Sequence, residues 1–204
     1  MKTYRIPLLA FVSVLLCACD QKNAINGHEY VDLGLSVMWA TCNIGADCPE
    51  EYGDYFAWGE TEPKEEYTEE NRKTLENSMG DIGGNASYDA ARANWGGSWR
   101  RPTRKEFQEL IDNCDWEWVR SKGKITGYRV TGKNGNSIFL PAAGHWDGAL
   151  LNNVGEYGSY WSSTPDGGDT QIAFYLYFYN DHWGMLWDWR GRDIGRSVRP
   201  VSEF

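Results

Sequence analysis

The sequence has few of the side chains that bind metal ions or build covalent frameworks. Only 3 His and 5 Cys occur among its 204 residues. The histidines His28, His145 and His182 are scattered, and no two cysteines have the CxxC spacing typical of zinc sites. We therefore expect neither a metal site nor a cofactor.

Basic residues are too few for a protein that binds nucleic acid. The chain has 20 Lys and Arg against 29 Asp and Glu, which gives a formal net charge of −9 at pH 7. An acidic protein repels phosphate backbones. We therefore expect no nucleic-acid partner.

Long hydrophobic runs are absent except at the start of the chain. Lys2 and Arg5 precede an apolar run over residues 7–17, which is too short to span a bilayer and has the shape of a signal peptide. The run ends in LCAC, which resembles a bacterial lipobox. That resemblance implies a signal peptide over residues 1–18 and lipidation of Cys19. The alternative is an ordinary secretory signal that happens to contain cysteine.

The remaining residues predict a tether followed by one domain. Residues 20–27 are polar and lack periodicity, which predicts a lipidated tether over residues 19–28. Residues 29–204 are enough for a single domain with a substantial core. An exported location permits disulfides, and the three cysteines that follow Cys19 in the chain favour one pair and one free thiol.

Two segments carry helix signals. In SWRRPTRKEFQELIDNC, Thr103 and Glu106 form a capping box, and apolar residues recur at helical spacing, which predicts a helix over 104–113. A shorter, alanine-rich helix is predicted over 88–95, with Asp89 as its N-cap. The highly charged stretch 60–76 is expected to be a solvated helix or loop.

The other periodic segments indicate short antiparallel strands. Asn134-Gly135 is a strong hairpin signal because both residues tolerate positive φ. Helices in the first half and strands in the second predict an α+β fold. The expected strands are a pair within 29–41 and the segments 127–131, 137–140, 160–163, 172–179 and 196–201.

Six blocks in order cover nearly all of residues 29–202: YVDLGLSVMWATCNIGA, EEYGDYFAWGET, GGSWRRPTRKEFQELIDNC, NSIFLPAAG, YGSYWSST and RSVRPV. Together they resemble the Fibrobacter succinogenes major paralogous domain of exported Bacteroidetes proteins, which is related to the C-type-lectin-like fold. The resemblance implies two helices and a small twisted antiparallel sheet with paired first and last strands, residues 31–35 beside 197–201. It also implies a Cys42–Cys114 disulfide with Cys48 as the odd thiol, and Cys42–Cys48 is the alternative pairing.

The segment IAFYLYFYNDHWGMLWDWRGRDIGRSVRP, residues 172–200, carries aromatic residues on both faces of a predicted strand. Phe174, Leu176 and Phe178 would supply the core, which leaves a tyrosine row on the other face. Tyrosine offers large, rigid contact area with a polar tip, and an aromatic patch with a charged rim is typical of a binding hot spot. The alternative is that the row packs beneath a loop.

The same segment resembles the variable region of proteins that diversity-generating retroelements rewrite. That resemblance implies fixed core positions at Phe174, Leu176, Phe178, Gly195, Ser197, Val198 and Arg199. It implies displayed, ligand-binding positions at Tyr175, Tyr177, Tyr179, Asp181, His182, Trp183, Trp187, Trp189, Arg190 and Arg192.

Catalysis is not expected. The block RRPTRKEFQEL is similar to a segment of formylglycine-generating enzymes, but those need a cysteine pair in the C-terminal part of the fold, and no Cys follows Cys114. Ser159, Ser162 and Ser163 lack a neighbouring His or a nucleophile elbow. The EPN and WND motifs of calcium-dependent lectins are also absent, which argues against calcium at a ligand site.

The sequence therefore predicts a monomeric, lipid-anchored binding module of the cell envelope, placed at the outer membrane. Its ligand would be a protein or a glycan, held by the aromatic C-terminal surface. A structural or assembly component of surface appendages is the alternative.

Overall fold

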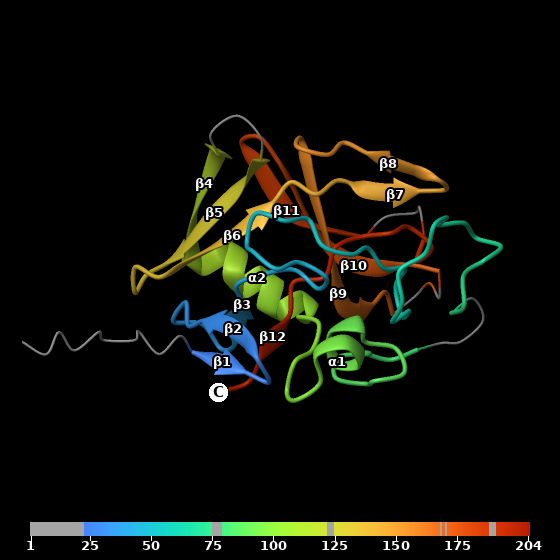
Figure 1. Ribbon diagram of the computed structural model, residues 1–204, viewed down its shortest axis with the longest axis horizontal. Helices are drawn as coiled ribbons and strands as arrows, with labels where there is room; N and C mark the ends of the chain where they lie inside the picture. Colours follow the sequence, from blue (N-terminus) through green and yellow to red (C-terminus); the bar gives the residue numbers. More distant parts are fainter. Residues whose placement is uncertain (1–22, 75–78, 122–124, 168, 170, 188–190) are drawn as a thin grey trace, which may run out of the picture.

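The computed structural model describes residues 23–74, 79–121, 125–167, 169, 171–187 and 191–204 (Figure 1). The predicted signal peptide and the lipidation at Cys19 lie outside these residues. Within them, no helix is both long enough and apolar enough to cross a membrane.

The described chain contains two helices and twelve strands, and every pairing between neighbouring strands within its four sheets is antiparallel. The first sheet joins both ends of the domain in the order β1-β2-β3-β12: Ala24–Ile25, His28–Val31, Met38–Ala40 and Val201–Ser202. The second has the order β4-β5-β6: Cys114–Ser121, Ile125–Gly132 and Ser137–Pro141. The third has the order β11-β10-β9: His182–Trp187, Ala173–Tyr179 and Tyr157–Pro165. The fourth pairs β7 with β8: His145–Asp147 and Leu150–Asn152.

Both predicted helices form as local capping dictates. Helix α2 spans Arg104–Asn113, and its capping box is complete because Thr103 accepts from the Glu106 amide while the Glu106 side chain accepts from the Thr103 amide. Helix α1 spans Ala90–Trp95, and Asp89 caps it by accepting from the Ala91 amide. Phe107 and Leu110 are buried and form the inner face of α2.

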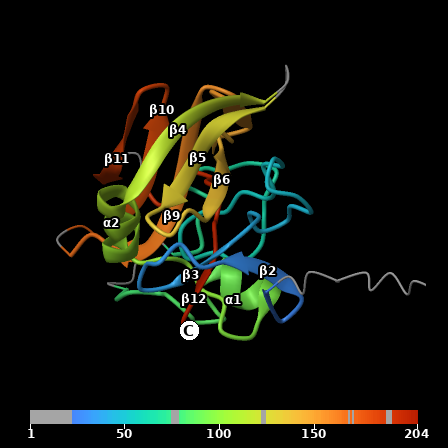
Figure 2. The ribbon, with the colours of Figure 1, turned by 90° about the vertical axis from the view of Figure 1, so that its left-hand side faces the viewer.

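The main core lies between the second and third sheets, with α2 across one end (Figures 1 and 2). Tyr128 on β5 meets Phe178 on β10 edge to face, with ring centroids 5.3 Å apart. Trp116 on β4 stacks on Trp183 of β11 at 5.6 Å. These contacts join the two sheets through one aromatic cluster.

The prediction of a single small sheet is wrong, although the mixed fold with few helices and antiparallel strands is confirmed. Strand β4 was missed, and it pairs with β5 along its whole length. The last strand does enter the sheet of the first strands, but β12 pairs with β3, Val201 opposite Trp39, and not with residues 31–35. Val31 is the last residue of β2, and residues 32–35 lie outside the sheet, with a bend at residues 34–35.

The described part of the charged stretch, residues 60–74, is irregular, but it is not solvated throughout. Glu60, Tyr67, Arg72 and Thr74 are buried, and Thr74 donates to the Trp58 carbonyl at 2.9 Å. The stretch therefore covers part of the core.

The three described cysteines, Cys42, Cys48 and Cys114, are free thiols in the structure, so the implied Cys42–Cys114 disulfide is absent from it. Cys114 follows α2 and packs against the main core. Burial raises its pKa to about 11. Cys42 instead lines a cavity of about 500 Å³ together with Cys48.

Candidate functional site

The face of β10 that points away from the main core is exposed at one end and buried at the other. At the exposed end, three tyrosines and one histidine form a continuous row of rings. We call this row the tyrosine ladder; it consists of Tyr157 on β9, Tyr177 and Tyr179 on β10, and His182 on β11.

Successive rings of the tyrosine ladder are in contact distance. Tyr157 and Tyr177 are stacked with centroids 6.4 Å apart, and Tyr177 lies 6.4 Å from Tyr179. Tyr179 stacks on His182 at 5.0 Å. The Tyr177 hydroxyl and His182 Nε2 are hydrogen-bonded at 3.0 Å. The ladder therefore has a fixed geometry before any ligand arrives.

Two features of the local sequence place the ladder. Gly184 is the cross-strand partner of Tyr177, and a Cβ added there would stand 3.3 Å from the Tyr177 ring, so the glycine leaves room for the ring to lie flat. Tyr179 pairs with His182 around a turn in which Asp181 has φ 62°, a left-handed conformation that Asp tolerates.

The surroundings of Tyr177 favour its neutral hydroxyl. Partial burial raises the pKa of Tyr177 above its ordinary value, and the neighbouring Tyr179 raises it further. At neutral pH the Tyr177 phenol therefore stays protonated and keeps both donor and acceptor capacity.

A hollow of about 300 Å³ adjoins the exposed end of the ladder at Tyr179. Its walls combine two aromatic rings with planar polar groups. The residues that line it are Trp118, Arg120, Thr126, Gly155, Glu156, Tyr179 and Asn180. Trp118 is held edge to face against Tyr128 at 5.0 Å, so this wall is fixed by the core. Flat rings beside amide, carboxylate and guanidinium groups suit the stacking faces and hydroxyls of a sugar ring.

The other end of the same face is buried beneath arginines. The Arg196 guanidinium lies 3.6 Å from the centroid of the Tyr175 ring and 4.7 Å from that of Trp161. Arg192 lies in the same way over Trp58, at 4.1 Å. Tyr175 is only 2% exposed as a result.

The structure therefore exposes some of the predicted ligand-binding residues and buries others. The structure brings Tyr177, Tyr179 and His182 together and exposes Asp181 at the turn beside them. The expected display is wrong for Tyr175 and Arg192, which the cation–π contacts bury.

Trp183 also departs from the prediction, since residues 182–187 form a strand and not a loop. It pairs with Phe178 and therefore shares the core-facing side of the sheet, where it is half-buried. The side chain of Trp187 and all of Trp189 and Arg190 lie outside the described residues.

Several residues of the candidate site were not predicted from the sequence. Tyr157 is one, although it is the Cα partner of Tyr179 across β9 and β10, so knowledge of the strand register would have found it. Trp118, Arg120 and Glu156 come from distant segments, and no local pattern connects them to Tyr179.

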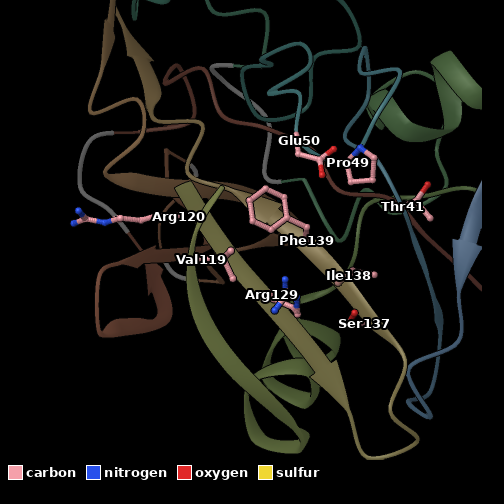
Figure 3. Close-up of a pocket in the computed structure, with 9 residues that line it drawn as sticks. All are labelled: Thr41, Pro49, Glu50, Val119, Arg120, Arg129, Ser137, Ile138 and Phe139. Carbon is pink, nitrogen blue, oxygen red and sulfur yellow. The ribbon is translucent and has the colours of Figure 1, made fainter. Parts of the chain in front are cut away.

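A second concavity of about 480 Å³ lies on the outer face of the second sheet. Figure 3 shows Phe139 and Arg129 facing Pro49 and Glu50 across it, while Arg120 points away. Arg129 is already paired with Glu117 at 2.7 Å, and both side chains are largely exposed. We therefore favour the tyrosine ladder, where ring contacts fix the geometry.

No group of three or more His, Cys, Asp or Glu side chains is placed to hold a metal ion in the part of the chain that the structure describes. Comparison with protein-family models, curated proteins and solved structures finds no match for this chain. The function therefore has to be argued from the site itself.

Proposed function

We propose that this chain is a binding module that holds a glycan on the tyrosine ladder and in the adjoining hollow. The observation that carries the proposal is the row of partly exposed, mutually fixed rings beside a hollow with a mixed aromatic and polar lining. Aromatic faces stack on the C–H edges of sugars, and the polar groups beside them accept and donate hydrogen bonds to hydroxyls.

We also propose that the module is anchored in the outer membrane through a lipid on Cys19. The lipobox resemblance supports the anchor. The arrangement of the domain is consistent with it, because β1, the first described strand, lies at one end of the molecule and the β10–β11 turn at the opposite end (Figures 1 and 2). A tether on the side of β1 would therefore present the ladder away from the membrane. The C-type-lectin-like fold, which the six sequence blocks imply, is part of the same proposal.

A glycan-array screen followed by calorimetric titration of the best ligand tests the proposed function. The double variant Tyr179→Ala/His182→Ala should bind that ligand at least about tenfold more weakly, because both stacking surfaces are lost. The matched control is Tyr88→Ala, which removes a comparably exposed tyrosine distant from the ladder in sequence. Equal affinity of the double variant and the control would place the site elsewhere. Binding to proteins alone would overturn the glycan assignment.

The resemblance to diversified proteins adds a more specific version of the proposal, a receptor whose displayed codons vary. All seven expected core positions are buried in the structure, from Phe174 to Arg199. Sequencing codons 170–201 in many sibling cells tests it. Variation should fall on Tyr177, Tyr179, Asp181 and His182 and spare Tyr175. An invariant stretch means a binding module of fixed specificity.

A further inference from the structure

Two arginines from distant parts of the chain lie close together inside the protein. Arg72 belongs to the irregular stretch after β3, and Arg192 lies between β11 and β12. The side chain of Arg72 is 1% exposed, and Arg192 is 1% exposed as a residue. Buried guanidinium groups normally have every N–H donor satisfied.

The structure leaves several of these donors unused. Arg192 donates from Nε to the Ile172 carbonyl at 3.3 Å and stacks on Trp58, but its Nη1 has no hydrogen-bond partner. Arg72 approaches Asp193 Oδ1 from Nη1 at 3.6 Å, and its Nε and Nη2 have no partner. Three buried donors on two adjacent cations are therefore free.

The charges around Arg192 do not compensate for its burial. Desolvation and, after it, the positive charge of Arg72 together lower the pKa of Arg192 to about 10. Asp166 and Asp169 act in the opposite direction but do not outweigh these two causes. Asp193 is the one carboxylate in ion-pair distance of Arg72 among the described residues. Burial raises the pKa of Asp193, which weakens it as a counter-ion.

We propose that Arg72 and Arg192 together form a binding site for a small oxyanion of the phosphate, sulfate or carboxylate class. An oxyanion would accept from the three unused donors and supply the missing negative charge. The guanidinium fork is the side-chain group best matched to such anions. This site is separate from the tyrosine ladder and does not depend on the proposed glycan-binding function.

The backbone beside the two arginines leaves space next to Arg72. Gly191, the residue before Arg192, has φ +80°, and a Cβ at this position would stand 3.4 Å from Arg72 Nη1 and 2.4 Å from Asp193 Oδ1. Any larger residue would therefore crowd Arg72 and its carboxylate partner. Glycine keeps that space clear and allows the left-handed turn.

The test measures inorganic phosphate and sulfate binding to the full chain at constant ionic strength, with chloride as the balancing ion. We expect phosphate to raise the thermal unfolding midpoint of the wild type and to shift the Nε–H resonance of Arg72 in nitrogen-15 spectra. Arg72→Lys keeps the positive charge but loses the fork, so it should bind at least about tenfold more weakly. Arg129→Lys, an exposed arginine in an ion pair, is the matched control and should bind like the wild type.

Two results would overturn the proposal. One is an unchanged midpoint and an unchanged Arg72 resonance in both anions at concentrations on the order of 50 mM, where even a weak site is occupied. The other is equal anion stabilisation of Arg72→Lys and Arg129→Lys, which would mean a general salt effect. If Arg72→Lys fails to fold, the resonance shift in the wild type alone decides.

A comparison of a sugar phosphate with inorganic phosphate identifies the source of the anion. A sugar phosphate that binds more tightly than inorganic phosphate would show that the anion is carried by a larger ligand. Tighter binding of inorganic phosphate would assign the site to a free ion. Both outcomes support an oxyanion site, and an unphosphorylated sugar should leave the Arg72 resonance unchanged.

Discussion

The two ends of the outward face of β10 have the same alternating sequence and opposite environments. At one end Tyr177 and Tyr179 stack with Tyr157 and His182 and remain partly exposed. At the other end Tyr175 is sealed beneath the Arg196 guanidinium. The difference comes from what covers each residue, since their spacing along the strand is identical.

This comparison shows how an aromatic strand can serve two purposes. The buried end connects β10 to Trp58, to Trp161 and to residues 192–196, so it holds the sheet in place. The exposed end then presents rings whose positions are already fixed. A rigid aromatic surface loses little conformational entropy when it binds a ligand.

The largest expected effect separates the two ends by stability. Tyr175→Ala should lower the free energy of unfolding by about 3–5 kcal/mol, because it empties a packed site and removes the ring beneath Arg196. Tyr179→Ala should change it by no more than about 0.5 kcal/mol, because that ring is 45% exposed. Urea denaturation of both variants measures the difference. Similar losses would show that the ladder is part of the core.

A pH titration extends the comparison to the two sides of the sheet. Burial raises the pKa of Tyr160, on the core side of β9, to about 12, and it raises that of Tyr177 on the outward side. Each phenol has a higher pKa in the folded than in the unfolded state, so its protonated form stabilises the fold. That contribution to the free energy of unfolding is complete below pH ~10 and is lost as the pH rises toward the folded pKa.

The free energy of unfolding should therefore fall above pH ~10, by up to about 1.4 kcal/mol per unit of pH for a single group. Denaturant midpoints across that range measure the fall. Tyr160→Phe should flatten the curve more than Tyr177→Phe does. A wild-type midpoint that stays constant through this range would contradict the burial of Tyr160.

A conservative change at Arg196 tests the cation–π contact directly. Arg196→Lys keeps the charge but loses planar stacking on Tyr175, so it should cost about 1–2 kcal/mol of stability. Arg129→Lys on the exposed face is the control and should cost less than about 0.5 kcal/mol. Chemical denaturation of the two variants gives the result. An equal cost would mean that stacking contributes nothing beyond charge.

The smallest expected effect lies within the tyrosine ladder. Tyr177→Phe keeps the ring and removes the hydrogen bond to His182 Nε2, so stability should fall by about 0.5–1 kcal/mol or less. The nitrogen resonances of the His182 ring should shift at the same time. A loss as large as that of Tyr175→Ala would place Tyr177 with the buried end.

Local signals in the sequence were enough to place both helices. The capping box at Thr103 and the alternation from Phe174 to Phe178 act within a few residues, and the structure follows both. Strand β4 was missed although Trp116 and Trp118 alternate with Asp115 and Glu117, a pattern that becomes clear only when β5 pairs with it. The fourth sheet, β7 with β8, was missed because each of its strands has only three residues.

The candidate site could be predicted only in part. Tyr177, Tyr179 and His182 were found because the turn between them keeps them close in sequence. Tyr157, Trp118 and Glu156 were not found, since sheet pairing and packing bring them to Tyr179 from far along the chain.

The sequence by itself determined that β10 would have two aromatic faces, because side chains alternate along any strand. Only the tertiary structure decided which tyrosines would meet solvent. That choice depends on Trp58, Trp161, Arg192 and Arg196, which cover Tyr175 and its neighbours. Burial is a property of contacts between distant segments, so no local pattern of residues can encode it.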